Sequence, residues 1–342
     1  MRQDLATKSL EQYPDVFADI INVNLYGGRQ VIAPEDLEKL PSSMIYRAPE
    51  GDMREMSSDI RMKLRRSGRE VAIVCIENQS GICNTMPVRD MGYVFAGYNE
   101  QVRLVKEENR RSGKRYYTKE IGDDQRVVPI ISLVLYFGRE EWERPLSLAG
   151  MLEIQEEDKE FVLPFIQEKA LRVIDLGRQD KETRDKYRSD FRHVVDYLAC
   201  GKDKHKLKQF MENSTRELAH PQEFLDVVGA VGSDARYQKV KEMIRCRTQK
   251  GEKVSMCVIA EELENTGIQK GLKKGLEKGL EKGLEKGNML CLIRQTLKKR
   301  EKGFSVSDIA DMLEEEERKI EQILLAAAEA GTENAEQVYD CL

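Results

Sequence analysis

Two neighbouring segments with the hydrophobic patterns of β-strands constrain the fold of this chain most. Residues 56–66 (MSSDIRMKLRR) alternate apolar and polar side chains, as a strand with one buried face does. Residues 70–79 (EVAIVCIENQ) form a nearly continuous apolar run that ends in polar groups, which is typical of an inner strand covered on both faces. The intervening turn, Ser67-Gly68-Arg69, has glycine at its centre, so we predict an antiparallel hairpin.

The register of this hairpin follows from the parity of its apolar residues. Pairing that is symmetric about residue 68 gives three apolar pairs on one face: Ile60 with Ile76, Met62 with Val74, and Leu64 with Ala72. A slip of one residue would turn the apolar set of one strand to the wrong face. The same pairing places Asp59 opposite Glu77.

The segments around the hairpin predict further helices and strands. Residues 5–25 carry an apolar stripe that stops at Gly27-Gly28, although Pro14 lies inside it and the helix could instead begin near Tyr13. A polar stretch with three prolines follows, and we expect strands only after it. Residues 84–111 have helical spacing, and residues 127–137 read as another buried strand.

These elements predict an α/β fold in which a mixed sheet is flanked by helices, followed by a mainly α-helical C-terminal region. We expect four parts along the chain: a core at 1–150, a helical extension at 151–250, a repeat segment at 251–290 and a helical module at 291–342. The last of these contains SVSDIADML, in which Ser305 begins a capped helix.

The repeat segment has a glycine at every fourth position. These glycines are Gly267, Gly271, Gly275, Gly279, Gly283 and Gly287, and they alternate with Ile268 and four leucines. Each glycine costs a helix about 1 kcal/mol relative to alanine, so an isolated helix here should be weak. Two interpretations stay open: self-association into a homo-oligomer with coiled-coil character, and a semi-ordered spacer.

Composition excludes several classes of protein. The chain has 56 Lys and Arg against 61 Asp and Glu, a net charge of -5, so any contact with DNA must be local. The seven cysteines form no C-x-x-C pair, which argues against a disulfide scaffold or a zinc module. No apolar stretch is long enough to cross a membrane, and we expect a cytoplasmic protein without membrane contact.

Asp59 and Glu77 are the first candidates for chemistry. Opposed side chains in a hairpin have Cβ atoms about 5 Å apart, and two like charges there are destabilising unless a positive charge lies between them. Carboxylate oxygens favour Mg²⁺ or Mn²⁺ as that charge, and Gln79 projects to the same side. The alternative is that both carboxylates are solvated at strand ends, but three polar residues directly after a buried run need a reason.

Several segments in order resemble a known family. They are Asp59 before the hairpin, IENQS at 76–80, MPVR at 86–89, a helix containing Tyr93, and DVFADIIN at 15–22. Together they resemble the recombination-promoting nuclease (Rpn) family of transposase-like proteins in the PD-(D/E)XK nuclease superfamily. The Lys-Gly repeat is also similar to tails common in that family.

The resemblance implies a restriction-endonuclease-like core and cleavage of DNA by a metal-activated water. Asp59 and Glu77 would be ligands of Mg²⁺ or Mn²⁺, and Gln79 would stand where the wider superfamily has lysine. Asp19 would be an additional acidic residue from the first helix, although a solvated helix carboxylate explains it as well.

Basic residues near these carboxylates favour a polyanionic substrate. Candidates for DNA contact are Arg61, Lys63 and Arg65 on the hairpin and Arg89 at the start of the next helix, with Arg110, Arg111, Lys114 and Arg115 beyond it. A solvated surface explains any single one of them equally well.

Three functions compete at this point. The first is a Mg²⁺-dependent DNA endonuclease linked to recombination or mobile elements. The second is an inactive DNA-binding or oligomerising scaffold of the same fold, because Gln79 replaces lysine. The third is metal-independent transposase chemistry, for which no nucleophile is paired with a base at recognisable spacing.

Overall fold

The computed structural model describes residues 3–47, 53–113, 121–166 and 170–342. The chain forms two compact units, Met1–Glu264 and Asn265–Leu342. The predicted basic residues Lys114 and Arg115 lie outside the described residues.

A mixed five-stranded sheet forms the centre of the first unit. Its strands, in spatial order, are β1 (Leu37–Leu40), β4 (Ile60–Arg66), β5 (Arg69–Gln79), β6 (Ile130–Tyr136) and β7 (Val173–Asp175). β1, β4 and β5 are antiparallel, whereas β5, β6 and β7 are parallel. A separate ribbon pairs β2 (Ser43–Arg47) with β3 (Met53–Ser57). The expected mixed sheet with flanking helices, followed by a mainly helical region, is confirmed.

The hairpin of β4 and β5 has the predicted register. Ile60 pairs with Ile76, Met62 with Val74, and Leu64 with Ala72. The turn is one residue tighter than predicted, because Arg66 already pairs with Arg69, and an irregularity after Leu64 reconciles the two. Ser67 and Gly68 both have positive φ, of 49° and 77°, as a two-residue type I′ turn requires.

The predicted single strand at 56–66 is wrong, because the chain breaks it at Ser58 and Asp59. β3 ends at Ser57 and pairs with β2, and β4 begins only at Ile60. Asp59 therefore lies just before the ladder and has no strand partner opposite it. The expectation that strands begin only after the proline-containing stretch is also wrong, because β1 and β2 lie within it. β1 pairs with β4, more distant in sequence, which no local pattern reveals, whereas β2 pairs with the next strand, β3, in a polar stretch that lacks the usual apolar alternation.

Two helices replace the single helix expected at 5–25. α1 (Gln3–Glu11) ends before Tyr13, and α2 (Pro14–Tyr26) begins with Pro14 in its first turn, as the alternative interpretation predicted. Gly27 ends α2 in the left-handed conformation, with φ of 63°. The helix predicted at 84–111 is confirmed as α3 (Met86–Arg111).

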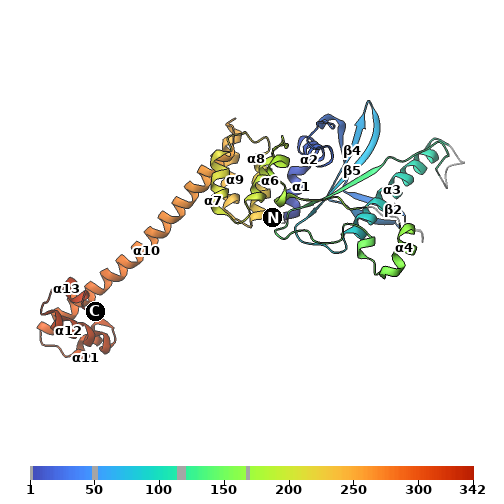
Figure 1. The fold of residues 1–342 in the computed structure, drawn as a ribbon. Helices are drawn as coiled ribbons and strands as arrows, with labels where there is room; N and C mark the ends of the chain where they lie inside the picture. The colour runs from blue at the N-terminus through green and yellow to red at the C-terminus, as the bar shows by residue number, and fades with distance from the viewer. Residues whose placement is uncertain (1–2, 48–52, 114–120, 167–169) are drawn as a thin grey trace. The chain divides into compact units, whose positions relative to one another are not determined.

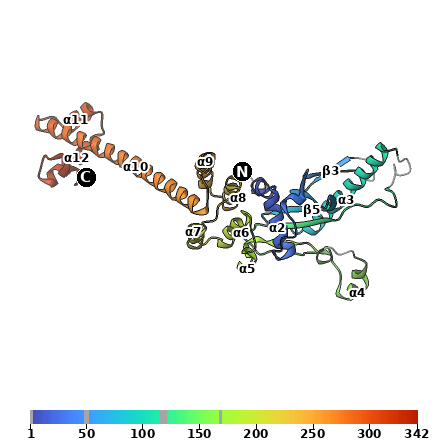
Figure 2. The same ribbon diagram turned by 90° about the horizontal axis from the view of Figure 1, so that it is seen from above.

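The helices after the sheet complete the core of the first unit. They are α6 (Phe191–Cys200), α7 (Lys204–Asn213), α8 (Pro221–Gly232) and α9 (Arg236–Gln249), with the short helix α5 (Lys181–Arg184) before them; another short helix, α4 (Lys159–Val162), lies between β6 and β7. One face of the sheet packs into a core that extends from Leu10 to Ile259, whereas the other face is covered by α3 (Figure 1). α3 also contacts β2 and β3, and Figure 2 shows β3 beside α3.

The second unit is entirely helical among its described residues. α10 (Met256–Glu301), which begins before the boundary between the units, continues through the glycine repeat without interruption, and α11 (Val306–Leu313), α12 (Glu317–Ala330) and α13 (Ala335–Tyr339) follow. The predicted cap is confirmed, since Ser305 Oγ accepts a hydrogen bond from the Asp308 amide. In the described part of the chain, no helix has the length and apolarity needed to span a membrane.

Candidate active site

Glu77 lies near the carboxyl end of β5, on the sheet face covered by α3, and is only 7% exposed. Its Oε1 accepts hydrogen bonds from Arg89 Nη2 (2.7 Å), Tyr93 Oη (3.1 Å) and Gln79 Nε2 (3.2 Å). Its Oε2 is buried and has no hydrogen-bond partner in the described structure. One oxygen of this carboxylate is therefore held by three donors while the other stays available.

Asp59 lies one residue before β4, at the same end of the sheet as Glu77, because β4 and β5 are antiparallel. Its Oδ2 accepts a hydrogen bond from the Asn78 amide (2.6 Å), so it is fixed directly to the residue after Glu77. Its Oδ1 forms an ion pair with Lys8 Nζ on α1 (2.7 Å). Asp59 and Glu77 are thus brought together by the chain, although not as a ladder pair.

Helix α1 contributes a third carboxylate, Glu11, which sequence reasoning missed. Asn78 Nδ2 donates to Glu11 Oε2 (2.6 Å) and to Thr7 Oγ1 (3.1 Å), which ties α1 to the end of β5. Glu11 is fully buried, and its Oε1 has no hydrogen-bond partner among the described residues. Lys8 and Glu11 share one helix face by their spacing, but nothing local connects them to the hairpin.

Burial and mutual repulsion raise the pKa values of these carboxyl groups. Burial raises the pKa of Glu77 to about 7, and the negative charge of Asp59 adds to the rise. Burial also raises the pKa of Glu11 to about 8, with Asp59 again contributing. The pKa of Asp59 is raised by burial, while Lys8 and the Asn78 amide oppose that rise. Burial is the largest cause for all three carboxyl groups; Lys8 offsets it only in part, and so does Arg89 at Glu77.

These groups fit a divalent cation of the Mg²⁺ or Mn²⁺ type. The unpartnered buried oxygen on Glu77 is costly unless something binds it, and the candidate donors on Asp59 and Glu77 are hard oxygens, while Glu11 lies behind them on the α1 side through its contact with Asn78. Across the described ranges, no three acidic, histidine or cysteine side chains lie close enough to hold a metal together. That is compatible with Mg²⁺, which usually keeps several waters and is bound through one or two carboxylates.

Asp19 lies apart from this cluster in its contacts. It is buried in α2, and its Oδ2 accepts hydrogen bonds from the backbone amides of Arg188 (2.8 Å) and Ser189 (2.7 Å) before α6. Burial raises the pKa of Asp19, and those amides oppose the rise. In the described structure Asp19 has no hydrogen bond or ion pair to Asp59 or Glu77, and its observed role is to dock α2 on the turn before α6.

The predicted basic residues differ in their availability for DNA. Arg61 is only 2% exposed, pairs with Glu100 (2.5 Å) and donates to the carbonyls of Pro41 and Ser43. Lys63 and Arg65 are on the hairpin surface, where both reach Glu70. Arg89 is 40% exposed at its side chain while it contacts Glu77, so it lies between solvent and the carboxylates.

A family model described as "Putative transposase, YhgA-like" matches residues 29–221, more than half of the chain. The chain belongs to this family. Neither the comparison with curated proteins nor that with solved structures gives a match. The result confirms the resemblance to the Rpn group and indicates a role with mobile DNA, and hence DNA as a partner. The YhgA-like match includes Asp59, Glu77, Gln79 and Arg89, whereas α1 lies outside it.

Proposed function

We propose that this YhgA-like protein is a metal-dependent DNA endonuclease that hydrolyses phosphodiester bonds, in connection with recombination or mobile elements. The observation that carries the proposal is the pair Asp59 and Glu77 at one end of the sheet, with a buried and unpartnered oxygen on Glu77. Membership of a transposase-like family supports DNA as the substrate.

In this proposal Asp59 and Glu77 hold Mg²⁺ or Mn²⁺. Such an ion lowers the pKa of a bound water and stabilises charge that develops on the phosphate. Lys8 balances the charge of Asp59, and Asn78 fixes Asp59 through its amide. Both contacts hold the carboxylate in place before substrate arrives.

Gln79, Arg89 and Tyr93 position Glu77 by donating to a single oxygen, Oε1. Their donation keeps Oε2 oriented away from them and available for a ligand. Arg89 is also the cation closest to solvent in this group and can meet a phosphate oxygen. Gln79 carries no charge, so Lys8 supplies the ammonium that the wider superfamily places on the strand.

A second function is favoured by one observation, the absence of a lysine at position 79. A chain with this fold could bind DNA as an inactive scaffold that self-associates through the exposed leucines of α10, of which Leu272, Leu276 and Leu280 are 64–72% exposed. We propose such self-association for the active enzyme as well.

The deciding experiment is a supercoiled-plasmid nicking assay in Mg²⁺, Mn²⁺, Ca²⁺ or EDTA. The wild type should nick DNA in Mg²⁺ or Mn²⁺ and not in EDTA, whereas Asp59→Asn and Glu77→Gln should lose at least about 100-fold in rate. Glu182→Gln, which neutralises an exposed carboxylate on α5, is the matched control and should cleave normally. Equal cleavage by all four proteins, or none in any metal, contradicts the nuclease and favours the scaffold.

Loss of a candidate ligand should also be visible without DNA. Mn²⁺ should raise the thermal unfolding temperature of the wild type, because the ion binds the folded chain only. Glu11→Gln should weaken Mn²⁺ affinity by about 10-fold, as expected for a group beside the metal ligands. An unchanged Mn²⁺ response in both Glu11→Gln and Glu77→Gln would place the metal elsewhere.

A further inference from the structure

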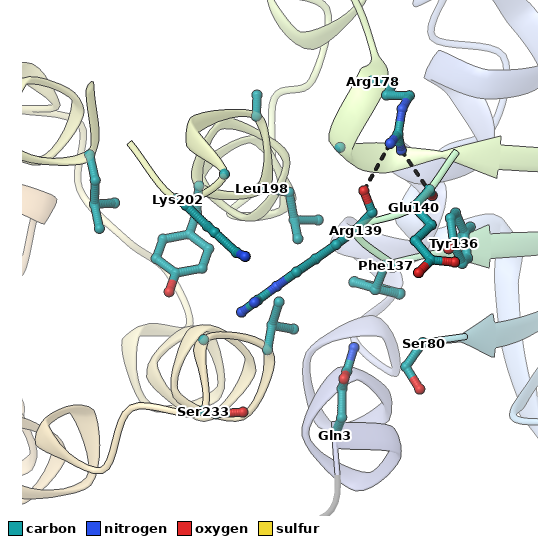
Figure 3. A pocket seen from close by; sticks show the side chains of 18 of the residues that line it. Gln3, Ser80, Tyr136, Phe137, Arg139, Glu140, Arg178, Leu198, Lys202 and Ser233 are labelled. Carbon is teal, nitrogen blue, oxygen red and sulfur yellow. Dashed lines mark hydrogen bonds between the residues drawn. The ribbon is translucent and has the colours of Figure 1, made fainter. Parts of the chain in front are cut away.

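A large cleft lies at the carboxyl ends of the parallel strands in the first unit (Figure 3). Its walls come from residues that follow β5, β6 and β7 and from the ends of α6, α7 and α8. Its volume is about 1270 Å³. Pockets for one small molecule usually measure roughly 300–1,000 Å³, so this cleft has room for a longer ligand.

The charge of the cleft is opposite to that of the whole chain. Its basic lining residues are Arg139, Arg178, Lys202, Lys204 and Arg236. Its acidic lining residues are Glu140 and Asp203, which leaves an excess of three positive charges (five minus two) in a chain of net charge -5. A local positive field in a concave surface attracts polyanions even when the molecule as a whole is acidic.

Three of these cations, Arg139, Lys202 and Lys204, have no ion pair within the described residues, and two of them converge in the cleft. Arg178 donates to Asp175 and to the carbonyls of Arg139 and Glu140, and Arg236 pairs with Asp234. By contrast, Arg139 and Lys202 form no ion pair within the described residues, and their side chains extend toward one another into the cleft (Figure 3).

The two acidic residues do not cancel these charges. The Asp203 carboxylate accepts from the amides of His205 and Lys206 at the start of α7. The Glu140 side chain points to the Tyr136 side of the cleft, away from the Arg139 guanidinium (Figure 3). Two converging cations without a carboxylate between them are unfavourable unless an anion joins them.

The cleft adjoins the candidate active site through two elements. Ser80 and Gly81 line the cleft and directly follow Gln79, whose carbonyl accepts a hydrogen bond from the Phe137 amide (2.8 Å). Gln3 also lines the cleft and belongs to α1, which carries Glu11. One extended ligand can therefore contact the cleft and the carboxylates at the same end of β5.

We propose that this cleft binds the sugar-phosphate backbone of a DNA strand, with Arg139 and Lys202 contacting its phosphates, and delivers the strand to the carboxylates at the end of β5. The identity of the ligand rests on the proposed nuclease function, and the cleft adds the residues that hold the substrate. A free nucleotide shares the phosphate chemistry, but the volume and the spread of charge from β6 to α7 favour a strand.

The test is DNA binding measured by fluorescence anisotropy in EDTA, where no cleavage occurs. The probes are a fluorescein-labelled single-stranded 15-mer and its duplex, at several salt concentrations. Arg139→Glu/Lys202→Glu should weaken binding of at least one probe by 10-fold or more and reduce the log–log salt slope by about 1–2, since each phosphate contact contributes roughly 0.7–0.9.

The matched control is Lys208→Glu/Lys239→Glu, which makes the same charge change at exposed residues of α7 and α9 outside the cleft and should bind like the wild type. Circular dichroism checks folding, and Arg139→Gln/Lys202→Gln replaces the charge reversal if that variant unfolds. Equal binding by the cleft variant and the control overturns the proposal, as does displacement of the probe by ATP at micromolar concentration.

The same variants separate this inference from the nuclease. Asp59→Asn and Glu77→Gln should not weaken binding of either probe in EDTA, because they leave the basic residues of the cleft in place and remove only negative charge. If no protein nicks plasmid but the cleft variant still loses DNA binding, the proposed DNA-binding cleft is supported and the proposed nuclease function is contradicted. If the wild type nicks plasmid and the cleft variant binds and cuts DNA normally, the nuclease function is supported and the proposed role of the cleft is contradicted.

Discussion

The Lys8 ammonium on α1 lies 2.7 Å from Asp59 Oδ1, which joins a helix near the N-terminus to a loop before β4. Lys8 also reaches Asp4 (3.1 Å) and lies close enough to Glu77 to lower the pKa of that carboxyl. The last three residues of β5, Glu77, Asn78 and Gln79, include no cation. Lys8 is therefore the cation that links the acidic groups of the candidate site.

Removing this ammonium should impair cleavage more than folding. We expect Lys8→Met to slow plasmid nicking in Mn²⁺ by about 10–100-fold, in the range of a lost charged group at a reacting centre. The ion pair is partly exposed, so the free energy of unfolding in urea should fall by about 1 kcal/mol or less. Lys8→Arg should recover part of the rate, and Lys181→Met, at an exposed position, should change neither quantity. Normal nicking by Lys8→Met would remove Lys8 from the site.

His193 should make the folded chain sensitive to acid. The imidazole is 4% exposed, lies near Phe210 and Phe224, and has no hydrogen-bond partner on either nitrogen in the described structure. Burial lowers the pKa of His193 to about 4, with Arg216 adding to the effect. Between that pKa and the unfolded value near 6.5, only the unfolded chain binds the proton, so stability falls as the pH drops.

The expected loss from His193 is about 2 kcal/mol between pH 7 and pH 5. It can be measured as the change in the urea unfolding free energy over this range. The unfolding free energy of His193→Leu should fall about 2 kcal/mol less over this range than that of the wild type, because leucine cannot be protonated and the other titrating groups are unchanged. Identical losses in the two proteins would show that the imidazole is not protected from protonation.

The hairpin turn offers a stabilising substitution. Ser67 has φ of 49°, a conformation that asparagine and glycine adopt at lower cost. Ser67→Asn should raise the free energy of unfolding by about 0.5–1 kcal/mol, and Gly68→Ala, with φ of 77°, should lower it by about 1 kcal/mol. Urea denaturation of both variants gives opposite signs if the turn is of type I′. A loss of stability in both would contradict that geometry.

The leucines of the repeat should control the oligomeric state. Leu276 and Leu280 on α10 are 72% and 64% exposed, and a second copy that covers them would remove this apolar surface from water. We expect light scattering to show an oligomer for the wild type and a monomer for Leu276→Glu/Leu280→Glu. Leu325→Glu, at an exposed leucine of α12 outside the repeat, should leave the mass unchanged. A monomeric wild type would support the spacer interpretation.

Local patterns predicted the hairpin and several helices correctly for a physical reason. The pairing of Ile60 with Ile76 depends on parity across one short turn, and the break near Pro14 depends on the missing amide of proline. By contrast, β1 and β2 lie in a polar stretch, and their pairing partners come from β4 and β3. The hydrophobic pattern of these two segments alone therefore does not indicate a strand.

The candidate site was predictable only in part for a similar reason. Glu77 and Gln79 stand out because they follow a buried run. The predicted register pointed to Asp59 as well, although Asp59 lies one residue before β4 and reaches this end of β5 through the Asn78 amide. Glu11 reaches the site only through its contact with Asn78, 67 residues later in the sequence, so no spacing rule indicates it. Asp19 was suggested by resemblance, and its contacts lie with residues 188–189, which again depends on tertiary packing. Its role in cleavage stays a prediction.

The central position of β5 sets an order for assembly of the sheet. β4 is connected to β5 by a two-residue turn, and hairpins of this kind close within about 1–10 μs. β6 can pair with β5 only after α3 has crossed between them, and such distant pairing is the slow part of folding. The cleft needs the ends of β5, β6 and β7 together with α6 to α8. A chain that emerges from the ribosome therefore acquires its carboxylate hairpin first and its phosphate-binding cleft last.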